Sequence, residues 1–243
     1  MKANKMLVFV LAAIVVLVSQ SFAANLASDK SSNYSGTWTN GSNGGTGFGL
    51  WTLSASGGGG SYIGGTGEAP SGSSFGIYGA TSGTSTAFRA FIGSLTAGQT
   101  FSIDLGNTTI TASGASMGLT LFSGATPEFT LQFTGGGADW QLNDGGSFFN
   151  TSQGYVANTP LLFTFTYNGG SSYSYTFGSA TGVNFTASNP ISGLNGVNLY
   201  NNAQGSGQNL GFDNLAIVPE PSTLALVGIS LFGAIGLIRR RKV

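Results

Sequence analysis

The sequence contains no cysteine and no histidine, and only 7% of its 243 residues are charged. Without cysteine the protein cannot form a disulfide, so its stability must come from a packed core or from bound ions. Without histidine it lacks the commonest general base and metal ligand. Ser-His-Asp and Cys-His catalytic sites are therefore excluded, as is any metal site that needs an imidazole.

Basic residues are also scarce in the middle of the chain. The formal net charge is zero, but four of the eight basic residues stand together at positions 239–242. Between residues 24 and 218 only Lys30 and Arg89 are basic, against seven acidic residues, which gives a net charge of −5. A protein that binds nucleic acid needs lysine and arginine to neutralise phosphates. We therefore expect no nucleic-acid partner.

The C-terminal segment combines an apolar run with a basic end. Leu224–Ile238 carries no charge, and Arg239, Arg240, Arg241 and Lys242 follow it directly. We predict a short transmembrane helix at residues 223–238, with the basic tail at 239–242 held on the cytoplasmic side. A buried core helix followed by a basic tail is the alternative.

The N-terminus has the pattern of a secretory signal peptide. Two lysines precede an apolar stretch at Met6–Val18, and Ser21-Phe22-Ala23 places small residues at the two positions that a signal peptidase needs. We predict a signal peptide at residues 1–23, cleaved after Ala23. An uncleaved N-terminal anchor is the alternative.

A short motif precedes the C-terminal apolar run. Val218, Pro219, Glu220 and Pro221 lead into the predicted helix and the arginine-rich end. This order resembles the PEP-CTERM sorting domain over residues 218–243. The resemblance implies an exported protein of a Gram-negative bacterium. Its partner would be an exosortase, a membrane-embedded cysteine protease that recognises Pro219-Glu220-Pro221 and cuts nearby. The protein would be anchored in the inner membrane transiently and then reach the cell surface or the extracellular space.

The region 24–218 has the pattern of an all-β domain. Apolar and polar residues alternate with a period of two, and clusters of turn residues separate the alternating stretches. We predict a two-sheet antiparallel sandwich, jelly-roll or concanavalin A-like, with a β-helix as the alternative. Gly36–Gly83 is the least regular part: we expect a strand at Phe48–Leu53 and a flexible loop at Gly57–Gly60. The other alternating stretches lie at 101–105, 119–121, 129–133, 163–167 and 173–177.

Two details of the strands can be predicted. In an antiparallel pair, the residue numbers of opposed residues have a constant sum. The aromatic residues of 163–167 and 173–177 all stand at odd positions, so they lie on the same face of the sheet only if that sum is even. This predicts Tyr167 opposite Tyr173, Phe165 opposite Tyr175 and Phe163 opposite Phe177 across a loop at 168–172. In the last strand, Asn209–Val218, the apolar positions change parity at Asp213-Asn214, and a β-bulge there would restore one inward face.

Candidate ligand contacts are few. Trp140 stands between Asp139 and Asp144 and is a candidate platform for a sugar ring. Asp213 is a candidate Ca²⁺ ligand, because its Phe-Asp-Asn-Leu context resembles the closing strands of carbohydrate-binding jelly rolls and carboxylates suit calcium. The alternative for Asp213 is a side chain that caps a turn or the bulge. No other cofactor is expected.

These observations favour a non-enzymatic exported protein of the cell surface or extracellular matrix. The resemblance to sorted proteins implies processing by an exosortase and association with exopolysaccharide in a biofilm. A carbohydrate-binding module that uses exposed Trp38, Trp51 or Trp140 is the second hypothesis. A glycan-active hydrolase is the third, and it would need two carboxylates facing each other across a cleft.

Overall fold

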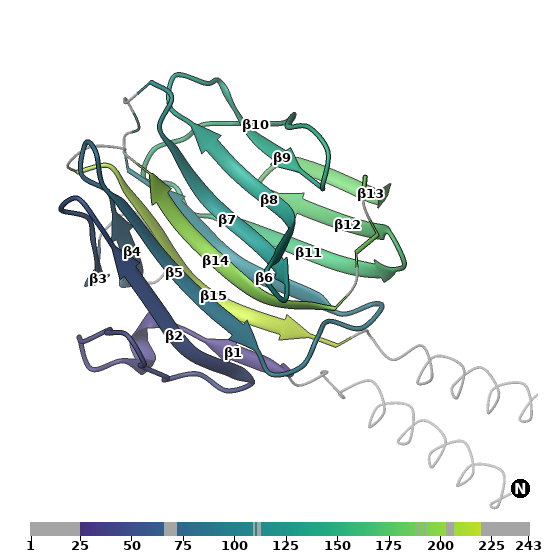
Figure 1. Cartoon of the computed structure of the whole chain (residues 1–243), viewed down its shortest axis with the longest axis horizontal. Coiled ribbons are helices and arrows are strands. Elements are labelled where there is room, and N and C mark those ends of the chain that lie inside the picture. The colour runs from purple at the N-terminus through teal and green to yellow at the C-terminus, as the bar shows by residue number, and fades with distance from the viewer. Residues whose placement is uncertain are drawn as a thin grey trace, which may run out of the picture. The chain divides into compact units, whose positions relative to one another are not determined.

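The computed structural model describes residues 25–65, 72–108, 110, 113–188, 190–191, 193–202 and 207–219. Within these residues the chain forms fifteen strands and one 3-10 helix, η1 (Ser31–Asn33). The strands build two antiparallel sheets that pack face to face, as Figure 1 shows. The prediction of an all-β two-sheet sandwich is confirmed, and the β-helix alternative is wrong.

The first sheet contains the last strand of the domain near its centre. Its order is β13-β12-β11-β6-β15-β4-β3, and β1 also pairs with β15. The strands are β1 (Ala27–Asp29), β3 (Gly60–Gly64), β4 (Ser74–Tyr78), β6 (Thr100–Asn107), β11 (Leu161–Gly169), β12 (Ser172–Phe177), β13 (Ala180–Thr186) and β15 (Asn209–Val218).

The second sheet covers the other side of the core. Its order is β10-β9-β8-β7-β14-β5-β2. The strands are β2 (Phe48–Ala55), β5 (Thr84–Phe91), β7 (Ser116–Ser123), β8 (Thr126–Thr134), β9 (Asp139–Asn143), β10 (Phe149–Gly154) and β14 (Leu194–Asn202).

The core between the sheets is rich in aromatic rings. One group joins Trp38 and Trp51 to Phe75 and Phe212, with ring centroids 4.8–5.9 Å apart. Burying one large apolar side chain contributes roughly 1.5–3 kcal/mol. The low charge and the many glycines of the sequence are therefore compatible with a well-packed interior that needs no disulfide.

The hairpin β11–β12 has the predicted register. Phe163 pairs with Phe177, Phe165 with Tyr175 and Tyr167 with Tyr173. The loop is shorter than predicted, because β11 runs through Gly169 and β12 begins at Ser172. Gly169 and Gly170 both have positive φ, which glycine adopts without the steric cost of a side chain.

The β-bulge predicted in the last strand is also confirmed. The register of β15 against β6 shifts between Asp213 and Ala216, and Asn214 has φ 53°. The shift returns Leu215 and Ile217 to the core side that Phe212 occupies. On its other edge β15 pairs with β4 before the bulge and with β1 after it.

The described part of the glycine-rich region Gly36–Gly83 contains more strands than predicted. It holds β3 and β4 in addition to β2, and Gly60 begins β3 instead of ending a flexible loop. The ring of Tyr62 lies against Gly76 and fills the place of the missing side chain. β4 therefore lacks an alternating pattern in the sequence, because the Tyr62 side chain of the neighbouring strand β3 covers Gly76.

Candidate functional site

The end of β15 is the point at which the domain meets the motif. Val218 pairs with Thr100 of β6, and Ile217 pairs with Ala27 of β1. The Leu26 N–H donates to the Ile217 carbonyl at 2.8 Å. The last strand is therefore held on both edges until its final residues. Pro219 is the first residue outside it.

Strand β1 is anchored to the opposite sheet by a buried ion pair. The guanidinium of Arg89, on β5, lies 2.9 Å from the Asp29 carboxylate, and neither side chain is exposed to solvent. Tyr34 Oη and Trp51 Nε1 donate to the same Asp29 oxygen, at 2.8 and 3.1 Å. The guanidinium also lies 4.7 Å from the centroid of the Trp51 ring, a cation–π contact.

Burial dominates the titration of this pair. Desolvation raises the pKa of Asp29, although Arg89 and the hydrogen bonds from Tyr34 and Trp51 act in the opposite direction. Desolvation likewise lowers the pKa of Arg89, and Asp29 opposes that change. The cluster ties the N-terminal strand to the core and offers no accessible group to a substrate.

Asp213 lies at the bulge, where its side chain is 1% exposed. Its carboxylate accepts the Ser31 backbone N–H at 2.7 Å and the Ser31 hydroxyl at 3.1 Å, so η1 covers it. Burial raises the pKa of Asp213, the hydrogen bonds from Ser31 and Asn214 oppose the rise, and nearby Asp104 adds to it. Within the described residues no three acidic side chains gather as metal ligands. The calcium role of Asp213 stays a prediction, which a thermal melt with and without chelator tests.

Two further acidic residues accept hydrogen bonds from neighbouring side chains. Asp144 accepts from Tyr173 Oη at 2.8 Å and from Ser188 Oγ at 3.1 Å. Asp104 stands opposite Asp213 in the ladder and accepts from Asn214. Two surface depressions, one beside Trp38 and one beside Asn25, contain one carboxylate between them, that of Asp29. Glu68 lies outside the described residues.

The interpretation of Trp140 as a sugar platform is wrong. Its side chain is 1% exposed, and its ring packs against Phe133 and Phe177 in the core. Trp38 and Trp51 are buried as well. The aromatic rings that do reach solvent include Phe88 and Phe122, at outward positions of β5 and β7. The sequence signal for these two rings was a phenylalanine that stands between the inward-facing positions of its strand.

Several predicted segments lie outside the described residues: the signal peptide 1–23 with Ala23, Glu220 and Pro221 of the motif, the helix 223–238, and Arg239, Arg240, Arg241 and Lys242. The described residues contain no helix with the length and hydrophobicity that a membrane span requires.

Comparison with solved structures supports the fold. A sialidase is similar over 83% of this chain, with a TM-score of 0.58 and 10% sequence identity. This chain covers 19% of that sialidase, about a fifth of its length. The cellulose-induced protein Cip1 is similar over 69% of this chain and 90% of its own length, with a TM-score of 0.51 and 11% identity. At such identities the likeness shows the fold alone. No curated protein sequence matched the chain.

The C-terminal end gives a more specific match. Residues 218–242 match the PEP-CTERM protein-sorting motif, which an exosortase recognises. The match begins at Val218, the final residue of β15, so strand and motif share that residue. This chain is therefore an all-β sandwich that carries a C-terminal PEP-CTERM protein-sorting motif directly on its last strand.

Proposed function

We propose that this chain is the precursor of a non-enzymatic protein of the cell surface or extracellular matrix. An exosortase would recognise Pro219-Glu220-Pro221 and cut nearby, which frees the domain from a transient inner-membrane anchor. The observation that carries this proposal is the sorting motif matched at residues 218–242. Because β15 reaches Val218, the three motif residues lie within about 10 Å of chain from the folded edge.

The side chains of the domain support a non-enzymatic role. The sequence has no histidine and no cysteine, which removes the usual nucleophile and base pairs. Glycoside hydrolysis would need two accessible carboxylates at a defined separation. Asp29, Asp144 and Asp213 are instead buried and engaged by neighbouring side chains.

Association with exopolysaccharide is the second part of the proposal. The domain is a sandwich similar in fold to a sialidase and to a cellulose-induced protein. The described surface exposes aromatic rings and uncharged polar side chains. Of the two basic residues between 24 and 218, Lys30 and Arg89, Arg89 is buried. A carbohydrate-binding module with the same delivery route fits these observations too, and it differs from a purely structural matrix protein in having a defined ligand face.

The sorting proposal is tested by changing the motif in cells. Replacement of Pro219, Glu220 and Pro221 together by alanine should leave the protein in the membrane fraction of a Gram-negative host that contains an exosortase. The matched control is Ser222→Ala, which lies next to the motif and should be released like the unchanged protein. Equal release of the triple variant would contradict recognition at this motif.

A further inference from the structure

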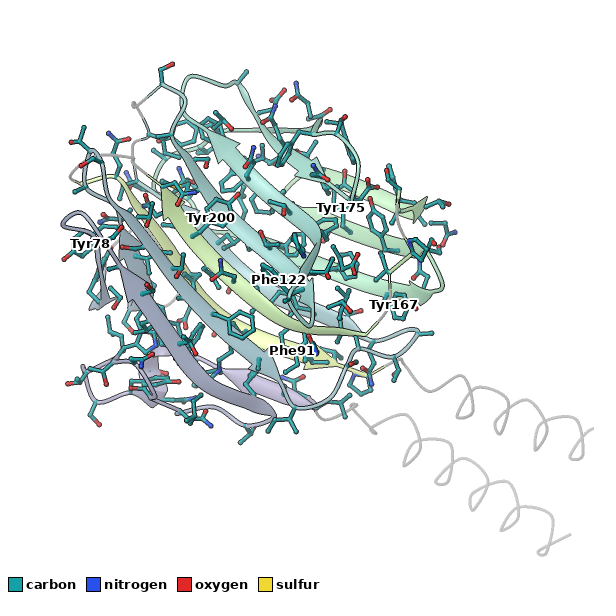
Figure 2. All side chains as sticks on the ribbon, in the orientation of Figure 1. Tyr78, Phe91, Phe122, Tyr167, Tyr175 and Tyr200 are labelled. Atoms are coloured by element: carbon teal, nitrogen blue, oxygen red, sulfur yellow. The ribbon has the colours of Figure 1, made fainter. Side chains whose placement is uncertain are left out.

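The second sheet has an outer face on which aromatic and polar side chains lie together. In the ladder β5-β14-β7, the inward residues Val197, Leu199, Leu119 and Leu121 are fully buried in the core. The residues between them point outward, where Asn198 stands opposite both Phe88 and Thr120. We call the outward set Phe88, Thr120, Phe122, Glu128, Thr130, Gln132 and Tyr200 the Phe122 face. Figure 2 labels Phe122 and Tyr200 over the middle of this sheet.

A glycine shapes the aromatic part of the Phe122 face. Gly196 pairs with Phe122 on one side and with Ala90 on the other. A Cβ on Gly196 would lie 2.8 Å from the Phe88 ring, so this ring lies over the bare backbone. The Phe88 and Phe122 rings stand edge to face, 6.2 Å apart, and both are half-buried. They present aromatic surface that the fold itself does not cover.

The polar part of the face is mostly paired within itself. Tyr200 Oη donates to Gln132 Oε1 at 3.0 Å, across the strand position that Gly118 occupies. Thr120 and Thr130 share a hydrogen bond between their hydroxyls at 3.1 Å. These bonds fix the side chains in place before any ligand arrives, which lowers the entropy that binding must overcome.

Glu128 is the exception. The register of β7 against β8 shifts between Leu121 and Phe122, and this bulge places Pro127 and Glu128 across from Phe122. Glu128 is 9% exposed, and no described residue donates a hydrogen bond to its carboxylate, whose oxygens reach solvent because neither is a fully enclosed unpaired atom. Water can therefore donate to this carboxylate, and a ligand hydroxyl that takes the place of the water would form a charge-assisted hydrogen bond with it.

The charge of the face limits what that partner can be. Of the two basic residues between 24 and 218, Arg89 is buried against Asp29 and Lys30 follows β1 in the other sheet. An anionic polysaccharide would therefore meet the Glu128 carboxylate and no described cation. A neutral sugar instead offers hydroxyl donors to Glu128 and weakly positive C–H groups to the electron-rich faces of Phe88 and Phe122.

We infer that the Phe122 face binds an uncharged polysaccharide. A pyranose ring packs on Phe88 and Phe122, and its hydroxyls donate to Glu128. The inference rests on the proposed function and names its ligand class and binding face. It depends on export only because the ligand lies outside the cell.

The test is affinity electrophoresis of the whole chain, produced without exosortase and kept in a detergent that has no sugar headgroup. The gels contain hydroxyethylcellulose, xyloglucan, galactomannan, dextran or a soluble β-1,3-glucan, with alginate and chitosan as charged probes. We expect retardation by at least one neutral polymer. Glu128→Gln keeps the size of the side chain but replaces a charged acceptor by a weaker neutral one, and Phe122→Leu removes one aromatic face. Each should weaken that binding roughly tenfold or more.

The matched controls lie on the outer face of the other sheet. Asp104→Asn removes a carboxylate there, and Leu162→Ala removes an apolar side chain that is 52% exposed. Both should bind like the unchanged protein, and thermal melts should show that all four variants are folded. Three results would overturn the inference: no retardation by any neutral polymer, retardation only by alginate or chitosan, or unchanged retardation of folded Glu128→Gln and Phe122→Leu. None of them bears on the sorting motif, since binding in the gel needs no exosortase.

Discussion

Arg89 and Asp29 hold the N-terminal strand against the core through a pair that solvent does not reach. Replacing Arg89 by leucine would leave the Asp29 carboxylate buried without its counter-charge. The loss of one partner of a buried pair typically costs about 3–5 kcal/mol. We therefore expect Arg89→Leu to lower the free energy of unfolding by roughly that amount, measured by urea denaturation.

The double variant Asp29→Asn, Arg89→Leu is the control for this prediction. It removes the uncompensated charge, while the amide can still accept hydrogen bonds from Tyr34 and Trp51. Part of the lost stability should return. If the double variant is as unstable as the sum of the two single variants, the coupling between the residues is refuted.

Asp213 gives a prediction about pH. Burial raises its pKa in the folded state above the ordinary value of 3.8. The stabilising contribution of this group is therefore fully present below that ordinary value and is lost as the pH rises through the folded-state pKa. Asp213→Asn does not titrate. The difference in unfolding free energy between the unchanged protein and Asp213→Asn should move in favour of the unchanged protein as the pH falls from about 7 to about 3.

Urea unfolding of both proteins at the two pH values measures this difference. A difference that is constant, or that moves toward Asp213→Asn on acidification, would contradict the raised pKa. Asp29 and Arg89 are present in both proteins, so their own titration cancels in the comparison.

Among the elements, the bulge in β15 depends on one backbone conformation. Asn214 has φ 53°, a region that asparagine and glycine tolerate and β-branched residues avoid. Asn214→Val and Asn214→Gly both lose the 2.8 Å hydrogen bond to Asp104. The valine variant should be less stable than the glycine variant by about 1–3 kcal/mol, the cost of strain at such a position. Equal stabilities in chemical denaturation would mean that the strand relaxes its bulge.

The elements also show what could be predicted from sequence. The hairpin β11–β12 and the strand β15 were predictable because large apolar residues stand at alternate positions on either side of the turn and of the bulge. Parity limited the β11–β12 register to even sums, and the short loop between the strands selected Tyr167 opposite Tyr173. β3 and β4 were not, because Tyr62 covers Gly76 from a neighbouring strand. Trp140 was misassigned for a related reason: sequence places it among turn-forming residues, whereas β9 turns it inward.

At the scale of the whole molecule, the first and last strands of the domain pair with each other. β1 begins at Ala27 and pairs with the last residues of β15. The sorting motif therefore begins on a strand whose last residues have both of their neighbouring strands only when the N-terminal strand β1 pairs with them. The motif could be recognised from sequence because it is local. The Phe122 face could not, because it combines side chains from four strands.

We propose above that the chain is exported and loses its C-terminal segment to an exosortase. The most direct measurement is the intact mass of the protein released by a Gram-negative host with and without its exosortase. We predict a released form that begins at residue 24, ends close to residues 219–221 and appears only when the exosortase is present. A released form that still carries Arg239–Lys242, or equal release in both hosts, would contradict the account.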